Sequence, residues 1–389
     1  MNNFIFENST RAILGKGCVK EYLSCFLQAY GDNVMLAYGG GSIKHNGIYD
    51  EVTEILNSAG KNVIEFSGIM SNPTYAKVMD GAQSARDNQV DVIVAVGGGS
   101  VMDCCKAVSL AARYKGDVWK DFWDNPGIVD FIPIPLCVIV TVSGTGSEMN
   151  GGAVITNEEL KIKKGRDYSA CNPKLALLDP TYTYSVPVRQ MISGGFDTLS
   201  HIMETYFSLP DEPNVSDDIS EALMRGVIRD LRAAIKNPND YTARSNLMWE
   251  ATMAENRIIK LGKKTDFECH MMEHQLGAFT NCNHGDGLAV LHPTYYYHIY
   301  KKGLNKFVRF AKNVWKIIPN DMSDDELAQA GIKALSDFIL EIGLPATLKE
   351  LGVDKNQIKE IASSCSISGG SYKQLTHDEI LNIFSECYE

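Results

Sequence analysis

The sequence predicts an α/β domain with a doubly wound parallel sheet, followed by a domain made only of helices. Three observations predict this class. In the first half, short apolar runs alternate with amphipathic segments of helical period, as in repeated strand–helix–strand units. Several runs are apolar almost throughout, which is typical of strands buried on both faces of a parallel sheet. Beyond about Pro187 the strand-like runs stop, and helical patterns follow one another.

The order of these patterns defines two expected domains. Strands are expected at 34–38, 62–66, 92–96, 137–142 and 175–178, with helices at 46–59, 74–88 and 101–114 between them. The second half shows helical patterns at 216–236, 243–260, 305–316, 324–342 and 355–364. We therefore expect an α/β domain over residues 1–187 and an all-helical domain over residues 188–389, with no clear linker between them.

Composition excludes several classes of protein. The 389 residues carry a formal net charge of -11, whereas a nucleic-acid partner requires a basic face. No stretch reaches the roughly 18 consecutive apolar residues of a membrane helix. The first residues lack the apolar run of a signal peptide, so a cytoplasmic protein is expected. The ten cysteines include no Cys-x-x-Cys pair, which favours reduced thiols over a disulfide framework.

Glycine-rich turns follow two of the expected strands. Gly39-Gly40-Gly41-Ser42 and Gly97-Gly98-Gly99-Ser100 each lead from a strand into helical sequence. Such turns let backbone N–H groups approach a phosphate at a helix N-terminus. Neither turn matches G-x-G-x-x-G, and each alone is also compatible with an ordinary β–α turn. A third loop, Ser143 to Glu148, follows the strand at 137–142 and is rich in hydroxyls and glycines, which suits ligand contact.

The first turn bears on the choice of dinucleotide. NAD-specific sites usually place a carboxylate against the ribose 2′-hydroxyl, where it would repel a 2′-phosphate. Here the turn offers Gly40, Gly41, Ser42 and then Lys44, with no acidic residue before Asp50. A hydroxyl, free N–H groups and a lysine favour the additional phosphate, so NADP(H) is the preferred hypothesis.

One aspartate and several histidines form a candidate metal site in the second half. Asp197 and His201 are four residues apart and would share one face of a helix. His270 and His274 form a second such pair, and His284 follows ten residues later. A carboxylate with imidazoles suits Fe(II) or Zn(II). Spacing does not show that these segments meet, and a single histidine on a helix is more often a hydrogen-bonded core or surface residue. Second-choice ligands are Cys269, Cys282 and Asp286.

These residues, in this order, resemble the iron-containing (group III) alcohol dehydrogenases along essentially the whole chain. The motifs that carry the resemblance are Gly97-Gly98-Gly99-Ser100-Val101-Met102-Asp103, Thr145-Gly146-Ser147-Glu148, Asp197-Thr198-Leu199-Ser200-His201, and His270-x-x-x-His274 followed by His284-Gly285. Within the family the chain is similar to the NADP(H)-dependent butanol dehydrogenase branch. Where NAD-preferring members carry an Asp, this chain aligns Gly40. The resemblance implies a Rossmann-like nucleotide domain and a helical metal domain, as in dehydroquinate synthase.

The resemblance also assigns roles to residues. It implies that Asp197, His201, His270 and His284 bind one divalent metal, Fe(II) or alternatively Zn(II), with His274 near the nicotinamide. The full set of candidate cofactor contacts is Gly40, Gly41, Ser42, Asn72, Gly97, Gly98, Gly99, Ser100, Asp103, Thr141, Ser143, Thr145, Ser147, Lys163 and Tyr182.

The implied reaction is the reversible reduction of a short to medium-chain aldehyde, such as butanal, by a nicotinamide, with the metal as Lewis acid. His274, or the cofactor ribose through water, is the candidate proton relay. Two other interpretations stay open. One is a relative resembling glycerol dehydrogenases or dehydroquinate synthase, although few basic residues for a phosphorylated substrate lie near the candidate ligands. The other is a non-catalytic nucleotide- or metal-binding protein. The resemblance further implies a homodimer, with no nucleic-acid or membrane partner.

Overall fold

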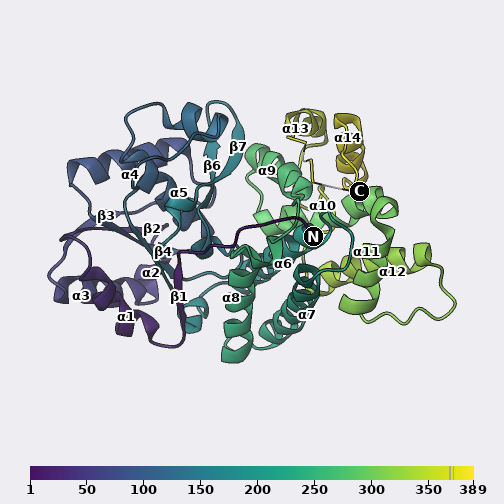
Figure 1. Cartoon of the computed structure of the whole chain (residues 1–389), viewed down its shortest axis with the longest axis horizontal. Helices are drawn as coiled ribbons and strands as arrows, with labels where there is room; N and C mark the ends of the chain where they lie inside the picture. The colour runs from purple at the N-terminus through teal and green to yellow at the C-terminus, as the bar shows by residue number, and fades with distance from the viewer. Residues whose placement is uncertain (368, 371) are drawn as a thin grey trace. The chain divides into compact units, whose positions relative to one another are not determined.

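The computed structural model describes residues 1–367, 369–370 and 372–389. Its chain forms two compact units (Figure 1). The first, here called the sheet unit, comprises Glu7–Pro187 and Pro238–Asn256. The second, the helical unit, comprises Met1–Phe6, Val188–Asn237 and Arg257–Glu389.

A six-stranded parallel sheet forms the centre of the sheet unit. Its strand order is β1-β8-β5-β4-β2-β3, and every neighbouring pair runs parallel. The strands are β1 (Arg11–Leu14), β2 (Asn33–Tyr38), β3 (Asn62–Phe66), β4 (Val92–Gly97), β5 (Leu136–Val140) and β8 (Leu175–Leu178). The central strands β4 and β5 are buried at every residue, which explains why their sequences are apolar throughout. The predicted parallel sheet is therefore confirmed.

Helices cover both faces of this sheet, as Figure 1 shows. On one face, α1 (Cys18–Leu27) and α3 (Ile48–Ser58) pack residues such as Leu23 and Val52 against the sheet. On the other face, α4 (Tyr75–Asp87) and α5 (Gly99–Ala111) bury Val78 and nearly the whole of α5. The short helix α2 (Ser42–His45) follows the first glycine turn. This arrangement is the doubly wound fold that the alternating patterns predict.

Two elements of the sheet unit are absent from the sequence-based prediction. The edge strand β1 has only four residues and no fully buried position, so its pattern is weak. The antiparallel hairpin β6 (Gly152–Asn157) and β7 (Ile162–Asp167) alternates buried and half-buried residues in β6. Its second strand is mostly polar, Ile162-Lys163-Lys164-Gly165-Arg166-Asp167, which hides the strand from a hydrophobicity pattern.

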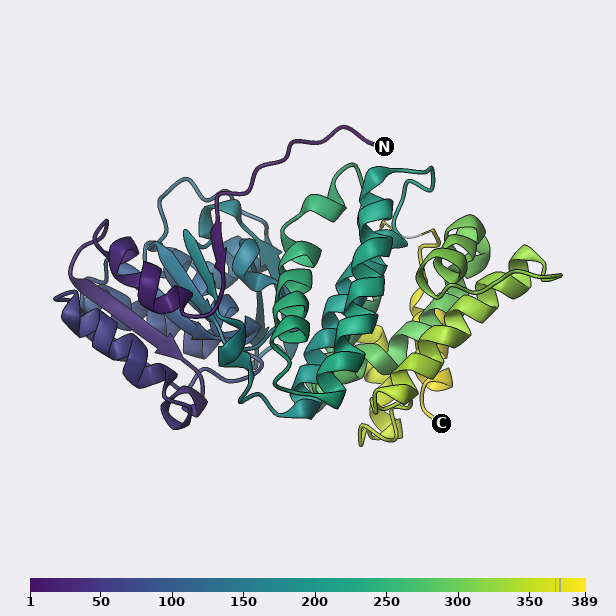
Figure 2. The same cartoon turned by 90° about the horizontal axis from the view of Figure 1, so that it is seen from below.

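The helical unit is built from eight α-helices in the described part of the chain. They are α6 (Val188–Tyr206), α7 (Val215–Lys236), α9 (Glu268–Thr280), α10 (His284–Ile299), α11 (Leu304–Arg309), α12 (Asp324–Glu341), α13 (Ile358–Ser364) and α14 (His377–Glu386). Helix α6 runs beside α7 (Figures 1 and 2) and also packs against α10, while α9 packs against α10. No helix in the described residues is long and apolar enough to cross a membrane.

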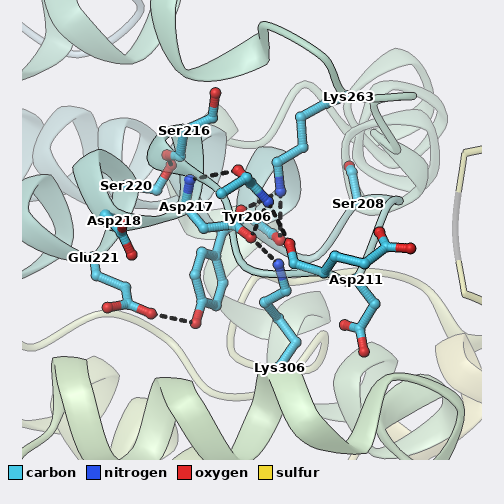
Figure 3. A network of polar contacts seen from close by, with 12 residues as sticks. Tyr206, Ser208, Asp211, Ser216, Asp217, Asp218, Ser220, Glu221, Lys263 and Lys306 are labelled. Carbon is cyan, nitrogen blue, oxygen red and sulfur yellow. Dashed lines mark hydrogen bonds and ion pairs between the residues drawn. The ribbon is translucent and has the colours of Figure 1, made fainter. Parts of the chain in front are cut away.

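A buried ionic network lies on α7 (Figure 3). The carboxylate of Asp217, near the start of α7, accepts hydrogen bonds from the ammonium groups of Lys263 and Lys306. All three side chains are essentially inaccessible to solvent. Lys263 also donates to the carbonyl of Tyr206 at 3.2 Å, and so links the end of α6 to α7. This network connects segments that are far apart in the sequence.

The compact units differ from a simple division at residue 187. Helix α8 (Tyr241–Glu255) comes from the second half of the sequence but belongs to the sheet unit. Its buried Arg244 donates to Thr183 Oγ1 at 2.9 Å, and its Thr252 donates to Glu148 at 2.6 Å. Conversely, Met1–Phe6 belongs to the helical unit. All ten cysteines are reduced, and eight of them are buried.

Candidate metal centre and nucleotide-binding turns

Three helices of the helical unit carry the candidate metal ligands. On α6, Asp197 and His201 are one turn apart, so both project from one face. Helix α9 contributes His270 from its first turn, and α10 begins with His284. The packing of α6 and α9 against α10 therefore brings together residues that lie 73 and 87 positions from Asp197 along the chain.

The three imidazoles converge on one carboxylate oxygen. The Nε2 atoms of His201, His270 and His284 lie 3.8, 3.7 and 3.5 Å from Asp197 Oδ1, respectively. Two ligands held about 2.1 Å from a tetrahedral ion are roughly 3.4 Å apart. These separations therefore match four atoms arranged around one ion. They are too long for direct hydrogen bonds between the imidazoles and the carboxylate.

Two of the candidate ligand atoms also lack a hydrogen-bonding partner among the described residues. Asp197 Oδ1 and His270 Nε2 are buried and have no hydrogen-bonding partner among the described residues. Burial opposes ionisation of Asp197, yet the neighbouring imidazoles of His201, His284 and His270 hold its pKa well below the usual value. Burial likewise lowers the pKa of His270, but the carboxylates of Glu204 and Asp197 raise it to about 10. The pocket thus favours positive charge at its centre, as a divalent cation site does.

Two further carboxylates orient the imidazoles from behind. Glu204 Oε2 bonds His270 Nδ1, and Glu273 Oε2 bonds His284 Nδ1. An acceptor at Nδ1 fixes that nitrogen as the protonated one and leaves Nε2 free to bind a metal. Glu204 Oε1 also accepts the backbone N–H of Cys269 at 2.8 Å, in the first turn of α9, where helical N–H groups lack partners within the helix. Glu204 therefore positions both the helix and its histidine.

Glu204 and Glu273 were not among the residues predicted from the sequence. A signal was present, because Glu204 lies seven residues after Asp197 and Glu273 three residues after His270. Both spacings return to the same helix face as the candidate ligand. Glutamates at such spacings are common on ordinary helices, so the pattern alone does not single them out.

A glycine allows α10 to approach α6 at the site. A Cβ atom on Gly285 would lie 2.2 Å from the carbonyl oxygen and 2.5 Å from Oγ of Ser193, on α6. No side chain larger than hydrogen fits there without moving a helix. Gly285 directly follows His284, so this close contact sets how near the imidazole lies to Asp197.

His274 and the second-choice ligands lie around the same centre. The ring of His274 is 5.8 Å from that of His284 and 6.2 Å from that of His270, and Glu273, His274 and His284 form a second close group. The Asp286 carboxylate is paired with Arg189 at 2.6 Å. Neither Cys269 nor Cys282 belongs to a metal-compatible group in the described residues. The side chain of His284 is 29 % exposed, so the site has an accessible side.

In the sheet unit, the second glycine turn joins β4 to α5. Gly97 ends β4, and Gly99 and Ser100 begin α5. A Cβ atom on Gly99 would lie 2.5 Å from Thr145, and one on Gly98 would lie 3.2 Å from Val142. The turn is therefore packed closely under the loop that follows β5. Its glycines are required by this packing, and they leave the first N–H groups of α5 uncovered by side chains of their own.

The first glycine turn is more open. Nothing lies within 4 Å of the Cβ positions of Gly40 and Gly41, and Gly41 has a φ of 100°. Ser42, which follows them, is exposed. Asn72 lies next to Ser71, whose carbonyl accepts a hydrogen bond from Ser100. Tyr182 is buried in the core on the α1 and α3 face.

The remaining predicted contacts surround a buried polar cluster. Ser147 donates to Asp103 at 2.6 Å and accepts from the buried ammonium of Lys106 at 2.7 Å. Asp103 also accepts the N–H of Val154 at 2.9 Å, and burial raises its pKa. These atoms are engaged within the protein and hold the loop after β5 against the hairpin, on which Lys163 is nearly buried.

The loop after β5 is tied down at three points. The N–H of Thr141 donates to the carbonyl of Gly97 at 3.0 Å. Ser143 donates to the carbonyl of Leu247, on α8, at 2.9 Å, and Thr145 Oγ1 accepts the N–H of Ser147 at 3.2 Å. All three predicted residues therefore lie at the carboxyl end of the sheet, where open α/β sheets bind ligands.

An α/β unit with glycine turns and a helical unit with a carboxylate–imidazole cluster are compatible with a protein that binds a nucleotide and a metal, and comparison with known families identifies the class. The profile of the iron-containing alcohol dehydrogenases matches residues 9–180, and the profile of that family's C-terminal part matches residues 191–388. The chain belongs to the iron-containing alcohol dehydrogenase family, which implies a nicotinamide cofactor and iron or another metal.

Individual relatives cover the whole chain. The NADH-dependent butanol dehydrogenase A of Clostridium acetobutylicum is 37 % identical, and the alignment covers 100 % of both proteins. The NADPH-dependent aldehyde reductase YqhD of Escherichia coli is 33 % identical over 100 % of this chain and 99 % of the relative. The crystal structure of NADH-dependent butanol dehydrogenase A from Thermotoga maritima superimposes with a TM-score of 0.94 at 33 % identity, covering 100 % and 99 % of the two chains.

Proposed function

We propose that the protein is a metal-dependent, NADP(H)-using alcohol dehydrogenase that reduces short to medium-chain aldehydes such as butanal and oxidises the corresponding primary alcohols. The observation that carries this proposal is the convergence of three imidazole Nε2 atoms on Asp197 Oδ1. We assign Asp197, His201, His270 and His284 as the ligands of one divalent ion, Fe(II) or Zn(II). When bound, the ion polarises the substrate oxygen as a Lewis acid, and the nicotinamide supplies or accepts the hydride.

Side chains of the protein orient the candidate ligands and supply a proton donor. The carboxylates of Glu204 and Glu273 keep Nδ1 of His270 and His284 protonated, so that both Nε2 lone pairs face Asp197. Reduction of an aldehyde consumes one hydride and one proton, and the proton must reach the substrate oxygen. His274, whose ring lies beside those of His270 and His284, is our candidate to deliver it.

The role of His274 is tested by kinetics. We expect His274→Ala to lower kcat by about 10²- to 10⁴-fold, the usual contribution of a general acid, and to change the pH profile. Metal content should stay unchanged, because His274 is not among the assigned ligands. An unchanged rate and pH profile would contradict the assignment.

The surroundings of the site favour an uncharged substrate. The ring of Phe267 lies 5.2 Å from that of His270 and 6.2 Å from that of His201. The ammonium of Lys260 lies over the ring of Phe267, 4.7 Å from its centroid. A phosphorylated substrate would require a cluster of basic side chains. We therefore expect short unbranched or small aromatic aldehydes to react faster than phosphorylated ones.

The choice of NADP(H) rests on the first glycine turn. The open backbone of Gly40 and Gly41, with Ser42 and Lys44 following, offers donors and a positive charge for a 2′-phosphate. The names of the relatives divide between NADH and NADPH. Catalytic efficiency with NADH equal to or above that with NADPH would contradict the preference.

We also expect a homodimer, which light scattering tests directly.

The central experiment is butanal-dependent oxidation of NADPH under anaerobic conditions. It is run on chelator-treated protein before and after addition of Fe(II) or Zn(II). We expect no turnover after chelation and recovery with one of the two metals. A matched Asp197→Asn variant should bind NADPH but show no recovery. Tight NADPH binding without turnover of any aldehyde or polyol would instead support a non-catalytic protein.

A further inference from the structure

In the fold, an acidic residue lies beside the first glycine turn. The sequence does not show this, because the first acidic residue after the turn along the chain is Asp50. Glu65, the fourth residue of β3, is 3.5 Å from the ammonium of Lys44 on α2. Strands β2 and β3 run parallel, so their carboxyl ends meet at one edge of the sheet. The fold therefore places a carboxylate next to the lysine that favours the 2′-phosphate.

Glu65 is held firmly in this position. It accepts hydrogen bonds from the hydroxyl of Tyr38 at 2.6 Å and from the hydroxyl of Tyr49. These donors, Tyr38 first, lower the pKa of Glu65, so the carboxylate is ionised at neutral pH. The ammonium of Lys44 lies over both aromatic rings, 4.3 Å from the centroid of Tyr49 and 5.2 Å from that of Tyr38.

The pair is accessible to a ligand. The side chains of Lys44 and Glu65 are 46 % and 44 % exposed, and the adjacent Gly40 and Gly41 have open space in front of them. Open α/β sheets bind dinucleotides at the carboxyl ends of their strands. A 2′-phosphate carries nearly two negative charges at neutral pH, whereas a 2′-hydroxyl carries none. Lys44 attracts only the phosphate, and Glu65 repels only the phosphate.

We propose that the Lys44–Glu65 pair, and not the glycine turn alone, sets the ratio of NADPH to NADH affinity, with Glu65 reducing the preference for NADPH. The proposal rests on the proposed function, because it requires that the adenosine end of a dinucleotide occupies the first turn. The relatives include one named for NADH and one named for NADPH. The pair would supply the carboxylate that the first glycine turn lacks and so adjust the preference between the two coenzymes. Tyr38 and Tyr49 act as positioning residues for the carboxylate.

The test is a binding titration without substrate. Dissociation constants for NADPH and NADH are measured by nicotinamide fluorescence on the wild-type protein with its metal, and on Glu65→Gln and Lys44→Met. Glutamine is isosteric and removes the charge, and its carbonyl oxygen still accepts from one tyrosine hydroxyl while its NH2 group can donate to the other. We expect Glu65→Gln to tighten NADPH binding by about three- to tenfold, and Lys44→Met to weaken it by a similar factor, as for exposed charge pairs acting on a doubly charged group. NADH binding should change less than about twofold in either variant.

Asp50→Asn provides the matched control, because Asp50 is an exposed acid of the same charge in the first turn of α3, whereas the ion pair of Lys44 is with Glu65. It should leave both constants unchanged. Equal shifts for NADPH and NADH, or weaker NADPH binding by Glu65→Gln, would overturn the inference. The wild-type ratio by itself tests the proposed NADP(H) preference, so the two can fail separately. A wild-type protein that binds neither dinucleotide would overturn both.

Discussion

At the candidate metal centre, the two ring nitrogens of His270 and of His284 have different partners. Nε2 of His270 and of His284 faces Asp197, while Nδ1 of each is bonded to a buried glutamate. Removing the acceptor at Nδ1 removes the preference for the tautomer that binds metal and lowers the basicity of the ligand. The carboxylates of Glu204 and Glu273 should therefore affect metal affinity through the imidazoles that they orient.

We expect Glu204→Gln to weaken metal binding by about 10- to 100-fold, the usual loss when such a partner is changed. Glutamine is isosteric, so the fold should be retained, but it has no charge and only one acceptor oxygen for the two donors, Cys269 N–H and His270 Nδ1–H. Competition with a chromophoric chelator measures the affinity directly, and the visible spectrum of a Co(II)-substituted protein reports a change in ligand geometry.

Glu148→Gln is a suitable control for this substitution. Glu148 is equally buried and hydrogen-bonded, but it lies in the sheet unit and accepts from the hydroxyl of Thr252 on α8. Metal affinity should be unaffected. If Glu204→Gln bound metal as tightly as the control, the orienting role would be wrong.

Sequence spacing predicts residues on one helix better than residues that meet across the fold. Asp197 with His201 and His270 with His274 are visible as pairs four apart, because a helix repeats every 3.6 residues. No comparable rule relates Glu65 to Lys44, since they belong to different elements and meet only when β2 and β3 pair. The roles assigned to the ligands stay predictions until metal binding is measured.

Among the secondary-structure elements, α10 begins in close contact with α6. The contact between Gly285 and Ser193 leaves no space for a methyl group. We expect Gly285→Ala to push the start of α10 away from α6 and to weaken metal binding, with a loss of stability of roughly 1–3 kcal/mol, typical of overpacking. Chelator competition and thermal unfolding measure the two effects.

Nucleotide binding provides the internal control for that variant. The glycine turns lie in the other compact unit, so the NADPH dissociation constant should not change. An alanine variant with normal metal affinity would show that α10 can shift without moving His284.

The ionic network on α7 is expected to stabilise the folded state without affecting catalysis. Asp217→Asn leaves the buried ammonium groups of Lys263 and Lys306 without a carboxylate partner (Figure 3). Breaking a buried pair in this way typically costs about 3–5 kcal/mol. We expect a clear fall in the free energy of unfolding in urea, with kcat of the remaining folded enzyme unchanged.

The next residue supplies the comparison. Asp218 pairs with Arg309 at 3.0 Å, but its side chain is 66 % exposed. Exposed pairs contribute about 0–1 kcal/mol, so Asp218→Asn should have little effect. Equal losses in the two variants would mean that burial of the network does not determine its contribution.

The elements that the sequence predicts are those with strong apolar periodicity. Strands β4 and β5 and helices α4 and α7 all lie where expected. The hairpin β6–β7 was missed because its second strand is largely polar, and β1 because it is short. Helix α8 was predicted as a helix, but its place in the sheet unit depends on buried contacts such as Arg244 with Thr183, which no local pattern encodes.

At the scale of the whole molecule, the sheet unit should depend on α8. A fragment of residues 7–187 lacks the partners of Ser143, Glu148 and Thr183. We expect it to unfold at a lower temperature, and to bind NADPH more weakly, than the same fragment with residues 238–256 joined through a flexible linker. Circular dichroism melting and the fluorescence titration measure both. Equal behaviour of the two fragments would make α8 dispensable.

The discontinuity of the sheet unit also affects how the protein is made. A ribosome releases the N-terminal side of the chain first, so the last helix of this unit is complete only after the stretch that ends at Asn256 has been synthesised. By then α6 and α7 of the helical unit have already been produced. Domains usually fold one after another during synthesis. We therefore expect the nascent sheet unit to stay incomplete while part of the other unit emerges, and its unfinished surface to be accessible to chaperones during that time.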